Sequence, residues 1–320
     1  MIWLIGCEGL LGKELGRQLK ENKFHWVGTD TEVDITDVEA LNRFEKSVET
    51  ASYYISETST HQDKSIKWII NCASYTNVEQ AEANQQEAQK VNTTGALNVA
   101  RIARKIGAKL IHISTDYVYH GNRNKPYTEE METEPVNYYG LSKLNGEIEI
   151  QKEMVQYYII RTSWLYGFDG KNFVSTMLKL MNSENNLRVV DDQRGTPTFC
   201  GNLSKAIIAL INKADNAKEI IGPKSAPSFG VYNYSDDGSA TWYEYSCEIY
   251  KTAKKTGLIN KECHIEPCSS ADYNSLAKRP AYSVLNKDKI QKELKIKIPS
   301  WKHSLENYLK SLKNLSDNNL

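Results

Sequence analysis

The stretch IWLIGCEGLLG, residues 2–12, decides the fold. Its first four residues form a continuous apolar run, which is typical of a strand buried on both faces of a parallel sheet. Three glycines follow at GxxGxxG spacing, and the apolar pattern through Leu15 and Leu19 predicts a helix after them. Glycines in a strand-to-helix turn let the backbone approach a pyrophosphate, which the helix N-terminus attracts. We therefore expect a dinucleotide-binding unit; the alternative is a merely flexible loop.

Further apolar runs at 26–29, 68–71, 110–113 and 157–161 predict more strands, with helical patterns between them. Strands that alternate with helices build a parallel sheet that is covered on both faces. We therefore predict an α/β protein. It should have a Rossmann-type, doubly wound parallel sheet and a smaller C-terminal α/β substrate domain.

The same patterns predict the domain organisation. Residues 1–166 are expected to form the NAD(P)-binding Rossmann domain, and residues 167–320 the substrate-binding domain. Segments near 200–212 and 231–235 should return to the first domain, so that the two interleave in sequence. The stretch 47–67 is polar and has no clear period, which favours an irregular surface insertion.

Composition excludes several classes of function. Forty basic residues balance forty acidic ones in a chain of 320, so no net charge attracts the protein to nucleic acid or an anionic membrane. No basic leader is visible, and no apolar run approaches the ~18 residues that a membrane helix needs. Cys263, His264 and Cys268 lack a fourth ligand, so we expect no metal there. A cytoplasmic protein with a small-molecule partner is expected.

A candidate proton-transfer pair lies in the middle of the chain. Tyr139 and Lys143 are four residues apart, so a helix would carry both on one face. A tyrosine titrates near pKa ~10, and a nearby cation favours its ionised form. Ser114 and Thr115 follow the strand at 110–113 and should reach the ligand edge of the sheet. The alternatives are an accidental Y-x-x-x-K pattern and hydroxyls that only form a turn.

Acidic and small residues suggest where the nucleotide lies. Asp30 ends the second strand, close to the ~20 residues after the glycines at which an acid accepts the adenosine ribose hydroxyls. It favours NADH over NADPH, although Lys13 and Arg17 could meet a 2′-phosphate. Asp34 and Ile35 could cover the adenine, or Asp34 could cap the helix expected from about Val38.

Six motifs together carry a family resemblance. The chain resembles the extended short-chain dehydrogenase/reductases and, within them, the dTDP-4-dehydrorhamnose reductase family. The match runs in order from residue 1 to about residue 300. Its motifs are GCEGLLG (6–12), NCASYTNV (71–78), STDYVY (114–119), the Tyr139/Lys143 pair, RTSWLYG (161–167) and DQRGTPT (192–198), with KRP (278–280) beyond them. Cys72 and the Tyr119-His120 pair depart from the usual family residues.

The resemblance implies a reaction and a set of site residues. NADPH or NADH would reduce the C4 ketone of dTDP-4-dehydro-6-deoxy-L-mannose (dTDP-4-keto-rhamnose) to give dTDP-L-rhamnose. Thr115, Tyr139 and Lys143 would be catalytic. The cofactor would contact Gly6, Gly9, Leu10, Leu11, Gly12, Asp30, Asp34, Ile35, Cys72, Ala73, Ser74, Asn92, Ile113, Ser114, Tyr139 and Lys143. The substrate would contact Thr115, Asp116, Tyr117, Trp164 and Arg279.

Some expectations stay open at this point. Trp164 could be ordinary core, and Arg188 and Arg194 join Arg279 as cations available for the diphosphate. Magnesium is known in the family, but only Glu14 suggests a counterpart here, so we do not assign the metal and leave magnesium open. The protein should be a monomer or a homodimer.

Two other functions compete with the reductase. One is another nucleotide-sugar reductase, epimerase or dehydratase of the same superfamily; Tyr117 counts against dehydration, because dehydratases usually carry an acid two residues after the threonine. The other is a non-catalytic regulatory subunit of the type associated with methionine adenosyltransferase.

Overall fold

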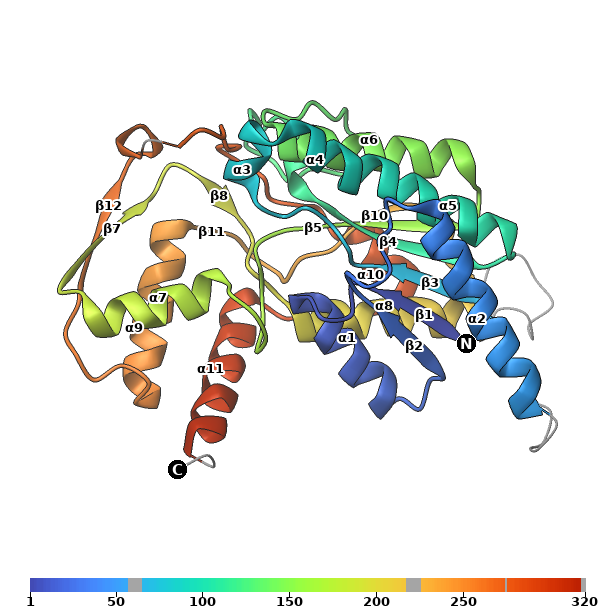
Figure 1. The fold of residues 1–320 in the computed structure, drawn as a ribbon. Coiled ribbons are helices and arrows are strands. Elements are labelled where there is room, and N and C mark those ends of the chain that lie inside the picture. The colour runs from blue at the N-terminus through green and yellow to red at the C-terminus, as the bar shows by residue number, and fades with distance from the viewer. Residues whose placement is uncertain (57–64, 217–225, 274, 318–320) are drawn as a thin grey trace.

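The protein is built on a six-stranded parallel sheet (Figure 1). The computed structural model describes residues 1–56, 65–216, 226–273 and 275–317. The strand order is β10-β5-β4-β3-β1-β2, and every pair in it runs parallel. The strands are β1 (Ile2–Ile5), β2 (Trp26–Thr29), β3 (Trp68–Asn71), β4 (Lys109–Thr115), β5 (Tyr157–Thr162) and β10 (Gly230–Asn233). The predicted α/β class is confirmed.

Helices cover both faces of this sheet, and each layer has its own apolar core (Figure 1). One face carries α1 (Leu10–Glu21), α8 (Cys200–Asn216) and α10 (Asp288–Leu294). The other carries α2 (Val38–Ser56), α5 (Ala96–Lys105) and α6 (Tyr138–Glu153). Strands β1 and β3 are buried along their whole length, as continuous apolar runs in a parallel sheet must be.

One expectation about this part was wrong. Residues 47–56 are not irregular but complete α2, the helix whose Phe44 lies against Trp3 of β1 with ring centroids 4.8 Å apart. The polar residues of this stretch gave no clear apolar period from which a helix could be predicted. Residues 57–64 of the predicted insertion lie outside the described residues.

A smaller α/β unit lies beside the sheet. Its aromatic-rich core joins α7 (Phe173–Ser183), α9 (Trp242–Thr256) and α11 (Trp301–Asp317) with the parallel pair β7 (Asn186–Val190) and β12 (His264–Cys268). The short pairs are β6 (Leu165–Tyr166) with β9 (Thr198–Phe199) and β8 (Arg194–Gly195) with β11 (Ala240–Thr241). Within the described residues, no helix is both long and apolar enough to span a membrane.

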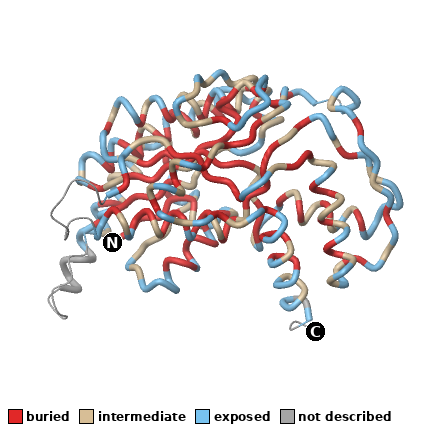
Figure 2. The backbone as a smooth tube through the Cα atoms, turned by 180° about the vertical axis from the view of Figure 1, so that it is seen from behind, coloured by how far each residue is buried: buried red, intermediate tan, exposed pale blue. Residues whose placement is uncertain are grey.

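The interleaving follows from β10 and α8, which come late in the sequence but lie in the sheet domain. Buried residues follow the sheet and its flanking helices, whereas the outer loops of both units are exposed (Figure 2). The strand order reverses between β1 and β3, and β1 pairs in register with both neighbours, Ile5 lying opposite Thr29 and Asn71. The residues after these three positions therefore leave the sheet at one edge, where ligands bind in open α/β sheets.

Candidate active site

A cleft of about 980 Å³ opens at this edge of the sheet. The glycine turn forms one end of it, and Gly6, Gly9, Leu10, Leu11 and Gly12 all line it. Gly6 has φ +77°, and a Cβ at Gly12 would stand 2.0 Å from the Gly6 carbonyl oxygen. Only glycine fits both positions, so the backbone itself makes the floor on which a pyrophosphate could lie.

Acidic groups surround the next part of the cleft. Asp30 lines it and accepts hydrogen bonds from the Glu8 and Thr31 N–H groups at 2.9 Å each. The two nearby cations are turned to other partners: Lys13 pairs with Glu8 at 3.2 Å, and Arg17 with Glu14 and Glu21. This end of the cleft is therefore acidic.

Asp34 and Ile35 also line the cleft, and Asp34 does not cap helix α2. Asp37, not Asp34, accepts the Glu39 N–H at the start of α2, at 2.9 Å. The Asp34 carboxylate bonds the Thr36 N–H at 2.8 Å within its own turn. Asp34 is therefore not needed for the helix and faces the cleft.

The end of β3 forms the opposite wall. Cys72, Ala73 and Ser74 line the cleft, and the Ala73 N–H donates to Asn71 Oδ1 at 3.1 Å. Burial raises the pKa of the Cys72 thiol to about 12, so it packs here as a small neutral group.

Asn92 is the one predicted site residue that the cleft lining does not include. It is buried in the π-turn Lys90–Gly95, where its amide bonds both backbone groups of Tyr75 and the Ser142 hydroxyl, at 2.8–3.1 Å. The bond to Ser142 ties this segment to the second turn of α6. Asn92 thus acts on the site through α6 in this structure.

The three predicted catalytic side chains come together at the end of β4. Ile113, Ser114 and Thr115 line the cleft there, opposite Tyr139 and Lys143 of α6. The helix begins where Asn137 caps it, its Oδ1 accepting the Gly140 N–H at 2.8 Å.

The pKa values of Tyr139 and Lys143, both on α6, are strongly shifted. Burial raises the pKa of Tyr139 to about 12, and a hydrogen bond with the Thr115 hydroxyl opposes that rise. Burial lowers the pKa of Lys143 to about 8. Its ammonium donates to the Ile113 carbonyl at 2.6 Å and lies 3.5 Å from His112 Nε2. The expected lowering of the tyrosine pKa by Lys143 is therefore not seen, because the lysine points at the backbone of β4.

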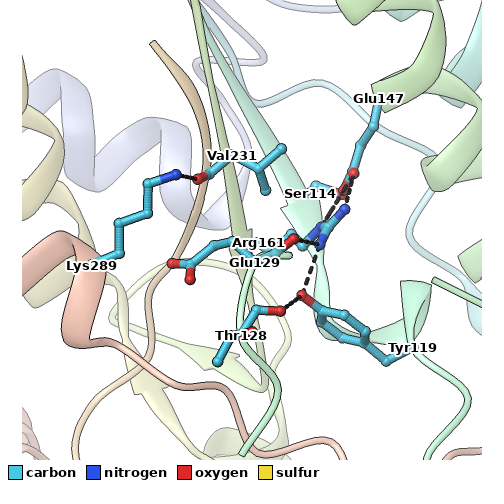
Figure 3. A network of polar contacts seen from close by, with 8 residues as sticks. All are labelled: Ser114, Tyr119, Thr128, Glu129, Glu147, Arg161, Val231 and Lys289. Carbon is cyan, nitrogen blue, oxygen red and sulfur yellow. Dashed lines mark hydrogen bonds and ion pairs between the residues drawn. The ribbon is translucent and has the colours of Figure 1, made fainter. Parts of the chain in front are cut away.

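A buried polar network joins α6 to β4 and β5 (Figure 3). Glu147, one turn beyond Lys143 on α6, accepts from Arg161 of β5 at 2.6 Å and from the Ser114 hydroxyl. Arg161 also donates to the Tyr119 hydroxyl at 2.7 Å. Sequence reasoning missed Glu147 and Arg161. The available signal was an arginine at the end of an apolar strand, which cannot be buried without a partner.

The substrate end of the cleft is aromatic. Trp164 lines it with φ +47° and stacks on Trp242 at 3.5 Å between centroids. Trp242 was not predicted as a lining residue because the two tryptophans are far apart in sequence. Tyr117 and Tyr139 meet edge to face at 6.0 Å.

Of the three candidate arginines, Arg279 is the one in the lining, where it pairs with Glu79 at 2.7 Å and opposes the rise that burial causes in the pKa of Tyr117. Arg188 pairs with Asp272 and Arg194 with Glu244 instead. Glu14 is buried against Arg17 and Gln18, and no group of three potential metal ligands occurs in the described part of the chain.

A glycine floor for a dinucleotide and a Tyr/Lys/Thr group at the end of the same sheet define an extended short-chain dehydrogenase/reductase, an oxidoreductase class. The family described as "RmlD substrate binding domain" matches residues 1–314. The chain belongs to this family of NAD(P)-dependent nucleotide-sugar reductases.

Relatives extend the match over the whole chain. The Bacillus subtilis "spore coat polysaccharide biosynthesis protein SpsK" is 34% identical over 99% of both chains. An Escherichia coli dTDP-4-dehydrorhamnose reductase is 34% identical over 76% of this chain and 79% of its own. A Bacillus anthracis dTDP-4-dehydrorhamnose reductase, solved in complex with NADP, superposes with TM-score 0.83 at 32% identity, covering 97% of this chain and 98% of that one.

Proposed function

We propose that this protein reduces the C4 ketone of dTDP-4-keto-rhamnose to give dTDP-L-rhamnose. The observation that carries the proposal is the meeting of the Tyr139 and Thr115 hydroxyls in a cleft whose other end has a glycine floor. The relatives' names support the same substrate. NAD(P)H, bound over the glycine turn, would supply the hydride.

The residues of this chain would do the rest. Tyr139 gives its proton to the ketone oxygen as negative charge develops there, which suits a phenol that burial keeps protonated. Thr115 donates a second hydrogen bond to the same oxygen, so that two hydroxyls stabilise one oxyanion. Lys143, one turn along the same face of α6, holds the ribose hydroxyls of the cofactor.

Substrate and cofactor preferences rest on the walls of the cleft. The stacked Trp164 and Trp242 form a flat apolar wall for the deoxy-sugar, and Tyr117 closes the pocket beside them. Arg279 would hold the diphosphate, for which a guanidinium is suited. The acidic surroundings of Asp30 support a preference for NADH, because a carboxylate repels the 2′-phosphate of NADPH.

The test is the loss of reduced-nicotinamide absorbance when the purified protein is given dTDP-4-keto-rhamnose with NADH or NADPH. We expect turnover with at least one cofactor, and we expect Tyr139→Phe to lower it ~100-fold or more at unchanged melting temperature. Near-native turnover of the Phe variant would remove Tyr139 as the acid. A folded wild type that binds cofactor but oxidises it with no nucleotide keto-sugar would favour a regulatory subunit.

A further inference from the structure

The hydrogen bonds of Thr115 leave its hydroxyl no free hydrogen. Its Oγ1 accepts the Tyr117 N–H at 3.2 Å. Its own hydrogen is donated to Asp116 Oδ1, 3.2 Å away. A hydroxyl has one hydrogen to give. As long as Asp116 takes it, Thr115 has none for a substrate oxygen.

Asp116 is unusually placed for a carboxylate. Its side chain is 2% exposed, and its second oxygen, Oδ2, is buried without a hydrogen-bond partner. Burial without a partner disfavours the charged carboxylate more than the neutral carboxyl, whose proton can lie on Oδ1 and be donated to Thr115. Both the ionised and the protonated form of Asp116 are therefore accessible.

The groups that face Asp116 do not hold it in the charged form. Tyr117, next in the chain, and Tyr139, of α6, are neutral phenols whose pKa values are raised. Arg279 reaches Tyr117 but is already paired with Glu79. Burial raises the pKa of Asp116 to about 7, while the hydroxyls of Ser283 and Thr115 oppose the rise.

We propose that Asp116 switches the Thr115 hydroxyl between two directions. When Asp116 is ionised, it captures the hydrogen of Thr115. When Asp116 is protonated, it donates to Thr115 Oγ1 instead, and Thr115 turns its hydrogen to the ketone oxygen of the substrate. Asp116 is thus a positioning residue that acts through Thr115, and the inference rests on the proposed function, in which Thr115 donates to that oxygen.

The switch predicts a pH dependence with a definite sign. Loss of one oxyanion donor typically costs ~100-fold or more in turnover. Turnover should therefore fall as the pH rises through the pKa of Asp116. Lys143 titrates in a neighbouring range, so a single wild-type profile cannot assign the fall to Asp116.

Asp116→Asn separates the two groups. The amide cannot ionise, and its N–H groups can donate to Thr115 as a protonated carboxyl does, whereas Lys143 is left to titrate in both proteins. We expect the ratio of variant to wild-type kcat to rise about tenfold from about pH 6 to about pH 8, as one ionisation near pH 7 requires. Parallel profiles for the two active proteins would overturn the switch.

Ser283→Ala provides the matched second variant. It removes a hydroxyl that lowers the pKa of Asp116, so the falling limb should move to higher pH. A merely structural role for Asp116 would not shift the limb, and an unshifted limb would contradict the assignment. A wild-type protein that is inactive at every pH with every keto-sugar would instead contradict the proposed function. Parallel profiles of two active proteins contradict only the switch.

Discussion

Two sets of buried charges lie along α6 and at the ends of β4 and β5, and the protein neutralises them in opposite ways. Glu147 and Arg161 are bonded to each other and to the Ser114 and Tyr119 hydroxyls, so that their charges are matched inside the protein (Figure 3). Lys143 and Asp116, a turn away, have no ion pair among the described residues. Their pKa values move towards neutrality, to about 8 and about 7, because burial disfavours both charges.

The matched charges stabilise the fold, whereas the unmatched charges are available for a reaction. A matched buried pair fixes α6 against the sheet, since moving either partner leaves the other charge unpaired. The unmatched groups line the cleft, where a ligand can complete their surroundings. The comparison therefore predicts that removing a matched charge unfolds the protein, whereas removing an unmatched one stabilises it and abolishes its chemistry.

The largest effect is expected from Glu147→Ala. The change leaves the Arg161 guanidinium buried without its carboxylate, which should lower the free energy of unfolding by about 3–5 kcal/mol. Denaturant unfolding measures it. Glu149→Ala on the same helix is the matched control: its pair with Lys152, whose side chain is 66% exposed, should be worth less than about 1 kcal/mol.

A double replacement sharpens this test. Changing Glu147 and Arg161 together to Met removes both charges, so it should cost much less than the single change. If Glu147→Ala and Glu149→Ala destabilise equally, the buried pair does not hold α6, and the first half of the comparison fails.

Lys143→Met tests the other half. The pKa of Lys143 falls from 10.5 to about 8 on folding, which corresponds to about 3 kcal/mol of cost at neutral pH. Loss of the bond to the Ile113 carbonyl offsets part of the gain, so the variant should unfold with about 2 kcal/mol more free energy at pH 7. Turnover should be nearly lost.

The gain of Lys143→Met has a pH dependence. A lowered folded-state pKa means that the cost is present below the folded value and disappears as the pH rises through the unfolded one, here between about 8 and 10.5. Melting of both proteins at about pH 7 and about pH 10 should therefore show the difference shrinking. If the variant is less stable than the wild type at pH 7, the charge of Lys143 stabilises the fold, as the matched charges do.

The sequence predicted the unmatched residues better than the matched ones. Thr115, Tyr139 and Lys143 follow from local spacing and strand ends, and so does the sheet, because parallel strands read as continuous apolar runs. Glu147 and Arg161 lie on different elements, α6 and β5, so no local spacing in the sequence indicates that they form a pair. The same holds for Trp164 with Trp242, which only the packing of the second unit brings together. Asn92 was predicted to bind the cofactor but is absent from the cleft lining, and its contacts with Tyr75 and Ser142 depend on a single π-helical turn without a sequence signature.

The smallest effect is expected at Asp30. Its hydrogen bonds within the protein resemble those of the matched charges, whereas its position in the cleft lining resembles that of the unmatched ones. It accepts two backbone N–H groups, yet it lines the cleft at the end where a ribose would lie. If it serves the ribose, Asp30→Ala should weaken NADH several-fold more than NADPH, because the carboxylate both accepts the ribose hydroxyls and repels the 2′-phosphate. Titration of cofactor fluorescence measures both affinities. Asp37→Ala is the control, since that acid caps α2, pairs with Arg43 and does not line the cleft. Equal losses for the two cofactors would mean that Asp30 merely holds the glycine turn through Glu8, and would move it to the matched charges.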